Sequence, residues 1–166
     1  ILHSPTYRSR FGEFLRIDYP RIPLPKQAIF FVALGKLGKK LISKHLMQGD
    51  LSDSTMLADH CEGTEVEKVS YSSNTVWIDK LETRGFKNVP TEVWNFQIGG
   101  YQVCEKWLKD RTSKKGNPGH ILTKDDIAHY QNIIFVIKET ILIMDEIDKV
   151  IDLHGGWPNA FSNSID

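Results

Sequence analysis

The sequence has few cysteines and no excess of charge. Its 166 residues include only two cysteines, Cys61 and Cys104, and its 21 basic and 21 acidic side chains give a formal net charge of zero. Two cysteines exclude a disulfide framework, and we interpret both as small thiols that are buried or half-buried. A net charge of zero excludes a general attraction to nucleic acid or to membranes, so any such partner has to be bound by a local patch.

The sequence also lacks a signal peptide, a long apolar run and a lipidation motif. We therefore predict a cytoplasmic protein without membrane contact. The first residue is Ile1 rather than methionine, and the chain around it already resembles the middle of a longer sequence. We interpret the chain as a fragment of a larger protein.

Recognisable catalytic and metal-binding patterns are missing as well. His60 and Cys61 have no further Cys or His nearby at the spacing of a structural zinc site, which needs four ligands. The pairs Gly99-Gly100 and Gly155-Gly156 fit neither a Walker loop nor a dinucleotide fingerprint. The sequence Asn117-Pro118-Gly119 lacks the second proline and the aromatic residue of the Asn-Pro-Pro-aromatic motif of amino-methylating enzymes, and we interpret it as a turn. We predict no catalytic residue, no metal site and no cofactor bound by this chain.

The first third of the chain predicts two helical segments joined by a stiff connector. Ser4 followed by Pro5 is typical of a helix start. Three prolines in residues 19–25 favour an extended link. A second helix is predicted over residues 26–47, where apolar side chains recur at helical spacing: Phe30, Leu34, Leu37 and Leu41.

The predicted second helix is also the most basic part of the chain. No acidic residue occurs between Lys26 and Lys44. The lysines form either a solvated face of a core helix or a phosphate-binding face. Gly35 and Gly38 weaken the helix, and we interpret them as positions that could allow close approach of another element.

The middle of the chain predicts β-structure. Alternating apolar residues flank Ser72-Ser73-Asn74, which suits a hairpin turn. A further short strand or turn is predicted around Arg84 and Gly85. We expect a small antiparallel sheet of about three to five strands.

Residues 93–111 form the most distinctive stretch. Trp94, Phe96 and Ile98 alternate as in a strand, and Gly99-Gly100 breaks the pattern before a helical period begins. We predict that this stretch is an inward-facing structural joint between the sheet and the helices. Its members are Trp94, Phe96, Ile98, Gly99, Gly100, Tyr101 and Trp107.

The last third predicts one long packing helix. It starts at Thr123, with Asp126 as an acidic capping partner, and Gly155-Gly156 ends it. Its isoleucines recur at alternating steps of three and four residues, with Asp148 as an interruption. The predicted fold class is therefore α+β: N-terminal helices, a small antiparallel sheet and a long C-terminal helix. We divide the chain into a helical connector, residues 1–48, and an α+β domain, residues 49–166.

Several motifs together resemble one protein family. They are His3-Ser4-Pro5-x-Tyr7-Arg8, Arg21-Ile-Pro-Leu-Pro25, Gly38-Lys-Lys-Leu41 with His45-Leu46, Trp94-x-Phe-x-Ile-Gly-Gly-Tyr101, Glu105-Lys-Trp-Leu-Lys-Asp-Arg111 and Asp125-Asp-Ile-x-His-Tyr130. The chain resembles the C-terminal specificity region of adenine-specific DNA methyltransferases fused to restriction enzymes, the Type ISP restriction–modification group. The resemblance covers nearly the whole chain, although the loop in residues 112–122 is longer than expected.

This resemblance implies a target-recognition domain for duplex DNA. It implies an upstream methyltransferase domain of the same polypeptide, which would bind S-adenosylmethionine and methylate adenine, and it allows nuclease and ATP-dependent motor domains further upstream. The fragment itself would not be catalytic. An alternative is a helical spacer or oligomerisation module of the same kind of enzyme, in which the long helix mediates self-association.

The candidates for DNA contact are polar and basic residues in the two basic stretches and in the turns of the sheet. Phosphate contacts are expected from lysines, and base contacts from turn and loop side chains. The candidates are Lys39, Lys40, Ser73, Asn74, Arg84, Lys87, Arg111, Lys114 and Lys115. Because the chain has no net charge, we predict weak DNA binding by the fragment alone.

Overall fold

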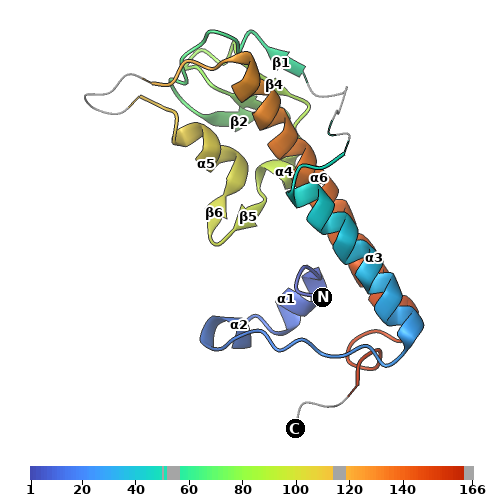
Figure 1. The fold of residues 1–166 in the computed structure, drawn as a ribbon. Helices are drawn as coiled ribbons and strands as arrows, with labels where there is room; N and C mark the ends of the chain where they lie inside the picture. Colours follow the sequence, from blue (N-terminus) through green and yellow to red (C-terminus); the bar gives the residue numbers. More distant parts are fainter. Residues whose placement is uncertain (50, 52–56, 114–118, 163–166) are drawn as a thin grey trace. The chain divides into compact units, whose positions relative to one another are not determined.

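The computed structural model describes residues 1–49, 51, 57–113 and 119–162. It has helices, a small antiparallel sheet and a long C-terminal helix, so the predicted α+β class is confirmed (Figure 1). The chain forms two compact units. We call residues 1–49 and 139–166 the helical unit, and residues 50–138 the sheet unit. The division by role into residues 1–48 and 49–166 stays a prediction.

The helical unit begins with the predicted capped helix, α1 (Pro5–Arg10). The hydroxyl oxygen of Ser4 accepts a hydrogen bond from the backbone N–H of Tyr7 at 3.0 Å, as an N-cap should. Asp148 on the long helix accepts three more hydrogen bonds: from the Ser4 hydroxyl, from the Thr6 backbone N–H at 2.9 Å and from the Thr6 hydroxyl at 2.7 Å. A carboxylate at a helix N-terminus is favourable, which explains why an acidic residue interrupts the apolar stripe.

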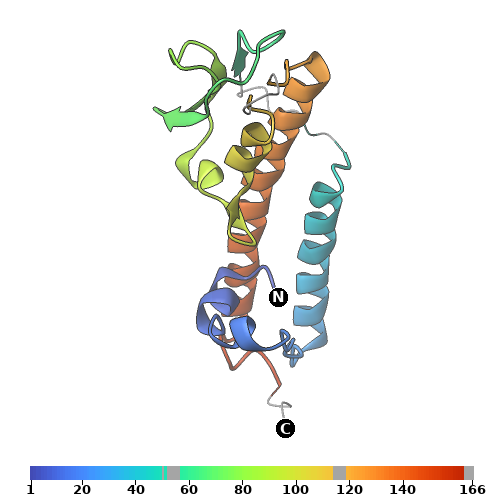
Figure 2. The same ribbon diagram turned by 90° about the vertical axis from the view of Figure 1, so that its left-hand side faces the viewer.

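The core of the helical unit lies between α3 (Ala28–His45) and the second half of α6 (Lys124–Leu153). Figure 2 shows the two helices running side by side. The buried side chains that form this core are Phe30, Leu41, Ile143, Ile147, Ile151, Ala160 and Phe161. A short helix, α2 (Phe14–Ile17), precedes the proline-rich connector to α3.

Ion pairs flank this helix pair. Lys44 Nζ lies 3.5 Å from Glu139 Oε2, and Lys40 Nζ lies 3.5 Å from Glu146 Oε2. A Cβ atom added at Gly35 or Gly38 would meet nothing within 4 Å. Among the described residues, therefore, neither glycine serves the close approach of another element, and that expectation is wrong.

The sheet unit contains four antiparallel strands: β1 (Leu57–Asp59), β2 (Ser70–Ser72), β3 (Thr75–Trp77) and β4 (Gly85–Lys87). Their order in the sheet is β1-β4-β3-β2, and the predicted hairpin at Ser72-Ser73-Asn74 joins β2 to β3. Val76 pairs with Phe86 across the sheet, and both are fully buried. Because successive side chains alternate between faces, the strand residues on either side of this pair point to the opposite face.

The predicted strand over residues 94–98 is wrong. A turn of helix, α4 (Thr91–Trp94), takes its place, because Pro90 starts a helical turn that the Trp94 N–H closes on the Pro90 carbonyl at 3.0 Å. A small hairpin follows, with strands β5 (Gln97–Ile98) and β6 (Tyr101–Gln102), and then α5 (Val103–Lys109).

Gly99 and Gly100 form the turn of this hairpin. Their φ angles of 57° and 81° are both in the left-handed region, as a two-residue hairpin turn with two left-handed residues requires. The hairpin leaves Ile98 58% exposed and Tyr101 63% exposed, so the expectation that both face inward is wrong. Phe96 is half-buried, while Trp94 is buried and Trp107 half-buried within the unit.

Tyr130, in the first half of α6, is the actual joint of the sheet unit. Its fully buried ring lies 4.5 Å from the ring of Phe86 on the sheet and 5.0 Å from that of Trp107 on α5. Its hydroxyl donates a hydrogen bond to the carbonyl of Cys104 at 3.2 Å. Cys61 and Cys104 are both buried, as predicted, and burial raises the pKa of each thiol to about 12.

The long helix α6 has 30 residues and is, among the described residues, the one helix long and apolar enough to cross a membrane by length and composition. Four of its apolar or aromatic side chains, Tyr130, Ile134, Ile143 and Ile151, are fully buried.

The start of α6 has the predicted capping arrangement. The Thr123 hydroxyl donates to Asp126 Oδ2 at 2.7 Å and accepts from the Asp126 backbone N–H at 3.2 Å. Replacing Thr123 by alanine is therefore expected to lower the free energy of unfolding by about 1 kcal/mol. Urea denaturation should show this loss, and Thr123→Ser should restore most of it because serine keeps the hydroxyl. Equal stability of the alanine and serine variants would contradict the assignment.

Candidate nucleic-acid interface

The β2–β3 turn presents two candidate residues to solvent. Ser73 and Asn74 are exposed, and their φ angles of 49° and 55° place both in the left-handed region. Such a turn matches the right-handed twist of the flanking strands. The turn therefore projects from the end of the hairpin, where its side chains can reach a ligand.

Tyr71 fixes this turn from behind. Its ring stacks on Trp94 with a centroid distance of 5.1 Å and an angle of 7° between the planes. Its hydroxyl donates to the Val89 carbonyl at 2.8 Å and lies 3.1 Å from Asn74 Oδ1, to which it can donate instead. The Val89 N–H donates to the Asn74 carbonyl at 2.9 Å. The Val89 N–H thus fixes the backbone of Asn74. The single hydroxyl proton of Tyr71 is donated either to the Val89 carbonyl or to the Asn74 side-chain oxygen, and the Asn74 NH₂ group remains a donor for a ligand.

A second presenting element is the loop between β3 and β4, which Asp79 holds together. The buried Asp79 carboxylate accepts from the Thr83 backbone N–H at 3.0 Å, the Thr83 hydroxyl at 2.7 Å and the Arg84 backbone N–H at 3.0 Å. Burial by itself raises the pKa of Asp79, but the hydrogen bonds from Thr83 and Arg84 outweigh it and lower the pKa. The loop thus has an internal anchor, and the exposed side chain of Arg84 has no ion-pair partner among the described residues.

The strand register places these two elements at opposite ends of one sheet face. Thr75 pairs with Lys87 next to the β2–β3 turn, and Trp77 pairs with Gly85 next to Arg84. The face between them is mainly polar and was missed by sequence reasoning. Its side chains are Leu57, Asp59, Ser70, Ser72, Thr75, Trp77 and Lys87, of which Leu57 and Trp77 are largely apolar, and we call it the polar sheet face.

Hydrogen bonds connect the polar sheet face. Trp77 Nε1 donates to the Ser72 hydroxyl at 2.8 Å, and the hydroxyls of Ser70 and Ser72 donate to Glu82 at 3.1 Å and 3.4 Å. Glu82 has a φ of 56°, so the loop backbone is twisted to bring this carboxylate over the sheet. The two-residue spacing of Ser70 and Ser72 before the hairpin turn, and of Thr75 and Trp77 after it, is the signal that could have identified this face.

Lys87, a predicted DNA contact, belongs to the polar sheet face but is already paired. Its Nζ lies 2.5 Å from Asp59 Oδ2, and the hydrogen bond from Lys87 lowers the pKa of Asp59. The charge of Lys87 is therefore largely compensated inside the protein.

Arg111 has a structural environment. Its guanidinium carbon lies 3.4 Å from the centre of the Trp107 ring, its Nη1 donates to the Trp107 carbonyl at 2.9 Å, and its Nε lies 4.0 Å from Asp126 Oδ1. Hydrogen bonds from Thr123 and His120 hold the pKa of Asp126 well below its ordinary value. Arg111 thus links α5 to the start of α6, and its contact with DNA stays a prediction.

The remaining lysine candidates are not part of this face. Lys39 and Lys40 lie on α3 in the helical unit, where Lys40 is paired with Glu146 while Lys39 is exposed and has no ion-pair partner among the described residues. Lys114 and Lys115 lie outside the described residues. Within the sheet unit, the structure places Ser73, Asn74, Arg84 and Lys87 around one sheet face.

Comparison with known proteins identifies this fold. A family model that describes the specificity domain of restriction–modification enzymes matches residues 1–146. The chain belongs to the Type ISP C-terminal specificity domain family, and the resemblance found in the sequence is confirmed. No curated protein matches the sequence.

Two solved structures share the fold. One is a nuclease-deletion mutant of the Type ISP restriction-modification enzyme LlaGI in complex with a DNA substrate mimic, with a TM-score of 0.63 and 20% identity. The other is the ATP-dependent Type ISP restriction-modification enzyme LlaBIII bound to DNA, with a TM-score of 0.62 and 18% identity. Each match covers 87% of this chain, which corresponds to only 13% and 10% of those much longer chains.

Proposed function

We propose that this chain reads the target sequence in duplex DNA for a Type ISP restriction–modification enzyme that methylates adenine. Membership of the specificity-domain family supports the proposal, and both similar structures are of enzymes bound to DNA or to a DNA substrate mimic. In this proposal an upstream domain of the same cytoplasmic polypeptide binds S-adenosylmethionine and carries out methylation. The chain positions the duplex so that this domain can reach an extruded adenine.

The observation that carries the proposal is the fixed, solvent-facing β2–β3 turn at one end of the polar sheet face. A two-stranded ribbon fits the major groove of DNA, where every base pair presents a distinct set of donors and acceptors. An asparagine side chain can pair with both N6 and N7 of adenine. Because Tyr71 and the Val89 backbone hold Asn74, this residue can make such a contact with little loss of conformational freedom.

The other members of the interface have different roles in this proposal. Arg84, with no ion-pair partner among the described residues, is expected to contact a phosphate and so to strengthen binding to all sequences. Glu82 is an acceptor that could bind the N4 amino group of cytosine. The face has few free cations, which agrees with weak binding by the chain alone.

The test compares Asn74→Ala with Arg84→Ala in the enzyme that carries this chain. Methylated sites on a plasmid are mapped by sequencing, and duplex binding is measured by fluorescence anisotropy at several salt concentrations. Asn74→Ala is expected to weaken binding to the methylated sequence about five- to one-hundred-fold, the range for losing one bidentate base contact, with little change for other sequences. Arg84→Ala is expected to weaken binding to all sequences. It should also make the slope of log binding constant against log salt concentration less steep by about 0.9, the value for one phosphate contact.

Asn95→Ala is the matched control, since Asn95 is an exposed asparagine at the end of α4, outside the polar sheet face. It should change neither the site preference nor the salt dependence. An Asn74→Ala enzyme with unchanged affinity and unchanged methylated sequence would overturn the assignment of the turn.

The alternative function, self-association through the long helix, has less support. The apolar stripe of α6 is buried against α3 in the helical unit and against Phe86 and Trp107 around Tyr130 in the sheet unit. A second helix could occupy that stripe only by displacing these contacts.

A further inference from the structure

The loop between β3 and β4 is anchored to the sheet unit on both of its sides. At its start, the Asp79 carboxylate accepts hydrogen bonds from the backbone N–H groups of Thr83 and Arg84, each at 3.0 Å. Further along, the Glu82 carboxylate accepts from two serine hydroxyls of β2 at 3.1 Å and 3.4 Å. Residues 80 and 81 therefore lie between two anchored positions.

Leu81 is the most exposed of the large apolar side chains that the structure describes in the sheet unit, at 82%. The next residue, Glu82, points its carboxylate back to the serines of β2, while Leu81 remains in solvent. Single apolar side chains are common on protein surfaces, so this exposure alone assigns no ligand. The charges around Leu81 give the second observation.

A cation lies on each side of Leu81 in the loop. Lys80 and Arg84 are both exposed, and neither has an ion-pair partner among the described residues. The one acidic residue between them, Glu82, is already hydrogen-bonded to β2. Lysine and arginine side chains in such a position suit contact with the phosphates of DNA, so the loop offers an apolar side chain between two phosphate-binding groups.

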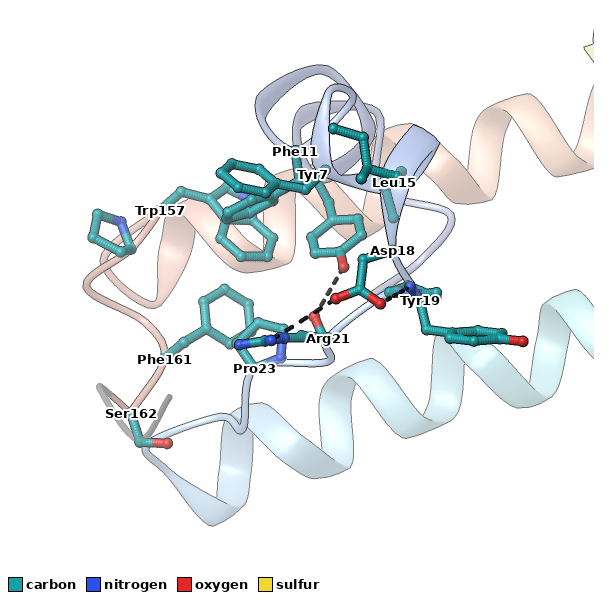
Figure 3. A pocket seen from close by; sticks show the side chains of 14 residues that line it. Tyr7, Phe11, Leu15, Asp18, Tyr19, Arg21, Pro23, Trp157, Phe161 and Ser162 are labelled. Atoms are coloured by element: carbon teal, nitrogen blue, oxygen red, sulfur yellow. Dashed lines mark hydrogen bonds and ion pairs between the residues drawn. The ribbon is translucent and has the colours of Figure 1, made fainter. Parts of the chain in front are cut away.

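The apolar groove of the helical unit lacks this combination. It has a volume of about 820 Å³ and is lined mainly by aromatic and aliphatic side chains of α1, the connector and the C-terminal segment (Figure 3). Arg21 is the one cation among its lining residues, and its Nη2 lies 3.9 Å from Asp18 Oδ2. An exposed apolar side chain beside unpaired cations is therefore a property of the β3–β4 loop and not of the groove.

The chemistry of the major groove identifies a partner for Leu81. The proposed function places the β2–β3 hairpin in that groove, and the β3–β4 loop lies at the other end of the same sheet face. A leucine side chain has neither a donor nor an acceptor. The apolar group that base pairs present in the major groove is the C5-methyl group of thymine, and the minor groove presents no such group.

We infer that Leu81 contacts the C5-methyl group of one thymine in the target sequence. The β3–β4 loop then recognises an A·T pair by an apolar contact, while Asn74 at the other end of the face recognises a base by hydrogen bonds. The inference rests on the proposed function, because that function supplies the duplex and its placement against the sheet face.

The test uses the enzyme that carries this chain and duplexes of the mapped methylation sequence. Each thymine is replaced in turn by deoxyuridine, which lacks the methyl group but keeps the base-pairing groups, and binding is measured by fluorescence anisotropy. At one thymine we expect affinity to fall about fourfold, the effect of losing one buried methyl group. The Leu81→Ala enzyme should bind the unmodified duplex at least about fourfold more weakly and should not respond to deoxyuridine at that position.

Leu153→Ala is the matched control, because Leu153 is a leucine of equal exposure, 83%, in the helical unit. The enzyme with this change should keep both the affinity and the response to deoxyuridine.

Equal affinity of the unchanged enzyme for all deoxyuridine duplexes would overturn the inference. So would a Leu81→Ala enzyme that still loses affinity at the same position, since another side chain would then contact the methyl group. Weaker binding by Leu81→Ala without any response to deoxyuridine would also overturn it, because Leu81 would then act in another way. Failure of the proposed function is distinguishable from these results, since the unchanged enzyme would then not prefer the methylated sequence over others.

Discussion

Replacing Phe86 by alanine is expected to lower the free energy of unfolding of the sheet unit by about 3–5 kcal/mol. Phe86 is fully buried in β4, pairs with Val76 and Ala58 across the sheet and packs its ring against Tyr130. Its removal deletes the ring contact between β4 and Tyr130 of α6, and this aromatic pair contributes about 0.5–1.5 kcal/mol beyond simple burial. Urea denaturation followed by tryptophan fluorescence measures the loss.

Leu81→Ala is a suitable comparison for Phe86→Ala. Leu81 lies in the loop between β3 and β4 and is exposed, so this change should alter stability by less than about 0.5 kcal/mol. A Phe86→Ala protein that loses less than about 1 kcal/mol would show that the sheet does not depend on its contact with α6.

Replacing Asp79 by alanine is expected to have the second largest effect. The change removes the acceptor for the backbone N–H groups of Thr83 and Arg84 and for the Thr83 hydroxyl. Leaving a donor without a partner costs about 1–3 kcal/mol where the donor is fully buried. Thr83 and Arg84 are exposed, so water replaces part of the lost hydrogen bonds, and a total loss of about 1–3 kcal/mol is expected. DNA affinity should fall as well. The Arg84 side chain is unchanged, but without the Asp79 carboxylate the backbone of Arg84 is no longer held in place.

The stabilisation of the fold by the Asp79 carboxylate should decrease as the pH falls. Its pKa in the folded protein is lowered, so the folded state favours the carboxylate, and its stabilisation is fully present above the ordinary aspartate pKa of about 3.9. The stabilisation is lost as the pH falls through the lower folded-state pKa. The difference in stability between the unchanged protein and Asp79→Ala should therefore be large at pH 7 and smaller at pH 3.

Asp79→Asn provides the control for charge. The amide keeps one acceptor oxygen and should retain part of the stability and most of the loop geometry, but without the pH dependence. An Asp79→Ala protein whose stability deficit is the same at pH 7 and pH 3 would contradict the role assigned to the ionised carboxylate.

The local signals in the sequence predicted most helices and turns correctly. Ser4 with Pro5 and Thr123 with Asp126 are direct start signals, and both helices start where those residues indicate. The helix over residues 28–45 follows from its apolar period. The hairpin at Ser73 and Asn74 follows from turn chemistry alone, because the side chains that favour such turns act within a few residues.

Interactions between distant residues could not be predicted in the same way. The alternation of Trp94, Phe96 and Ile98 suggested a strand, but a helical turn after Pro90 and a glycine hairpin replaced it. The capping of α1 by Asp148 joins residues 142 and 144 positions apart, and no local pattern reports such a contact.

The residues of the candidate interface likewise divide into those predicted from local sequence and those that depend on contacts between distant residues. Ser73, Asn74 and Arg84 were predicted from turn composition, and all three are exposed around one sheet face. Ser70, Ser72, Trp77 and Glu82 were missed, because their shared face depends on the pairing of strands. The ion pair of Lys87 with Asp59 and the stacking of Arg111 on Trp107 also depend on tertiary contacts, so composition alone could not predict either interaction.

The left-handed backbone of the β2–β3 turn also limits how this domain can diversify. Only glycine, asparagine and aspartate adopt such angles routinely, and most other side chains at residues 73 and 74 would carry a conformational penalty of about 1–2 kcal/mol. Few types of side chain can therefore be presented to a ligand at residues 73 and 74. Residues 80–84 include only one left-handed position, Glu82, among the described residues, so substitutions in that loop are less restricted. Descendants of this protein that acquire new specificities should therefore vary more in the β3–β4 loop than in the turn.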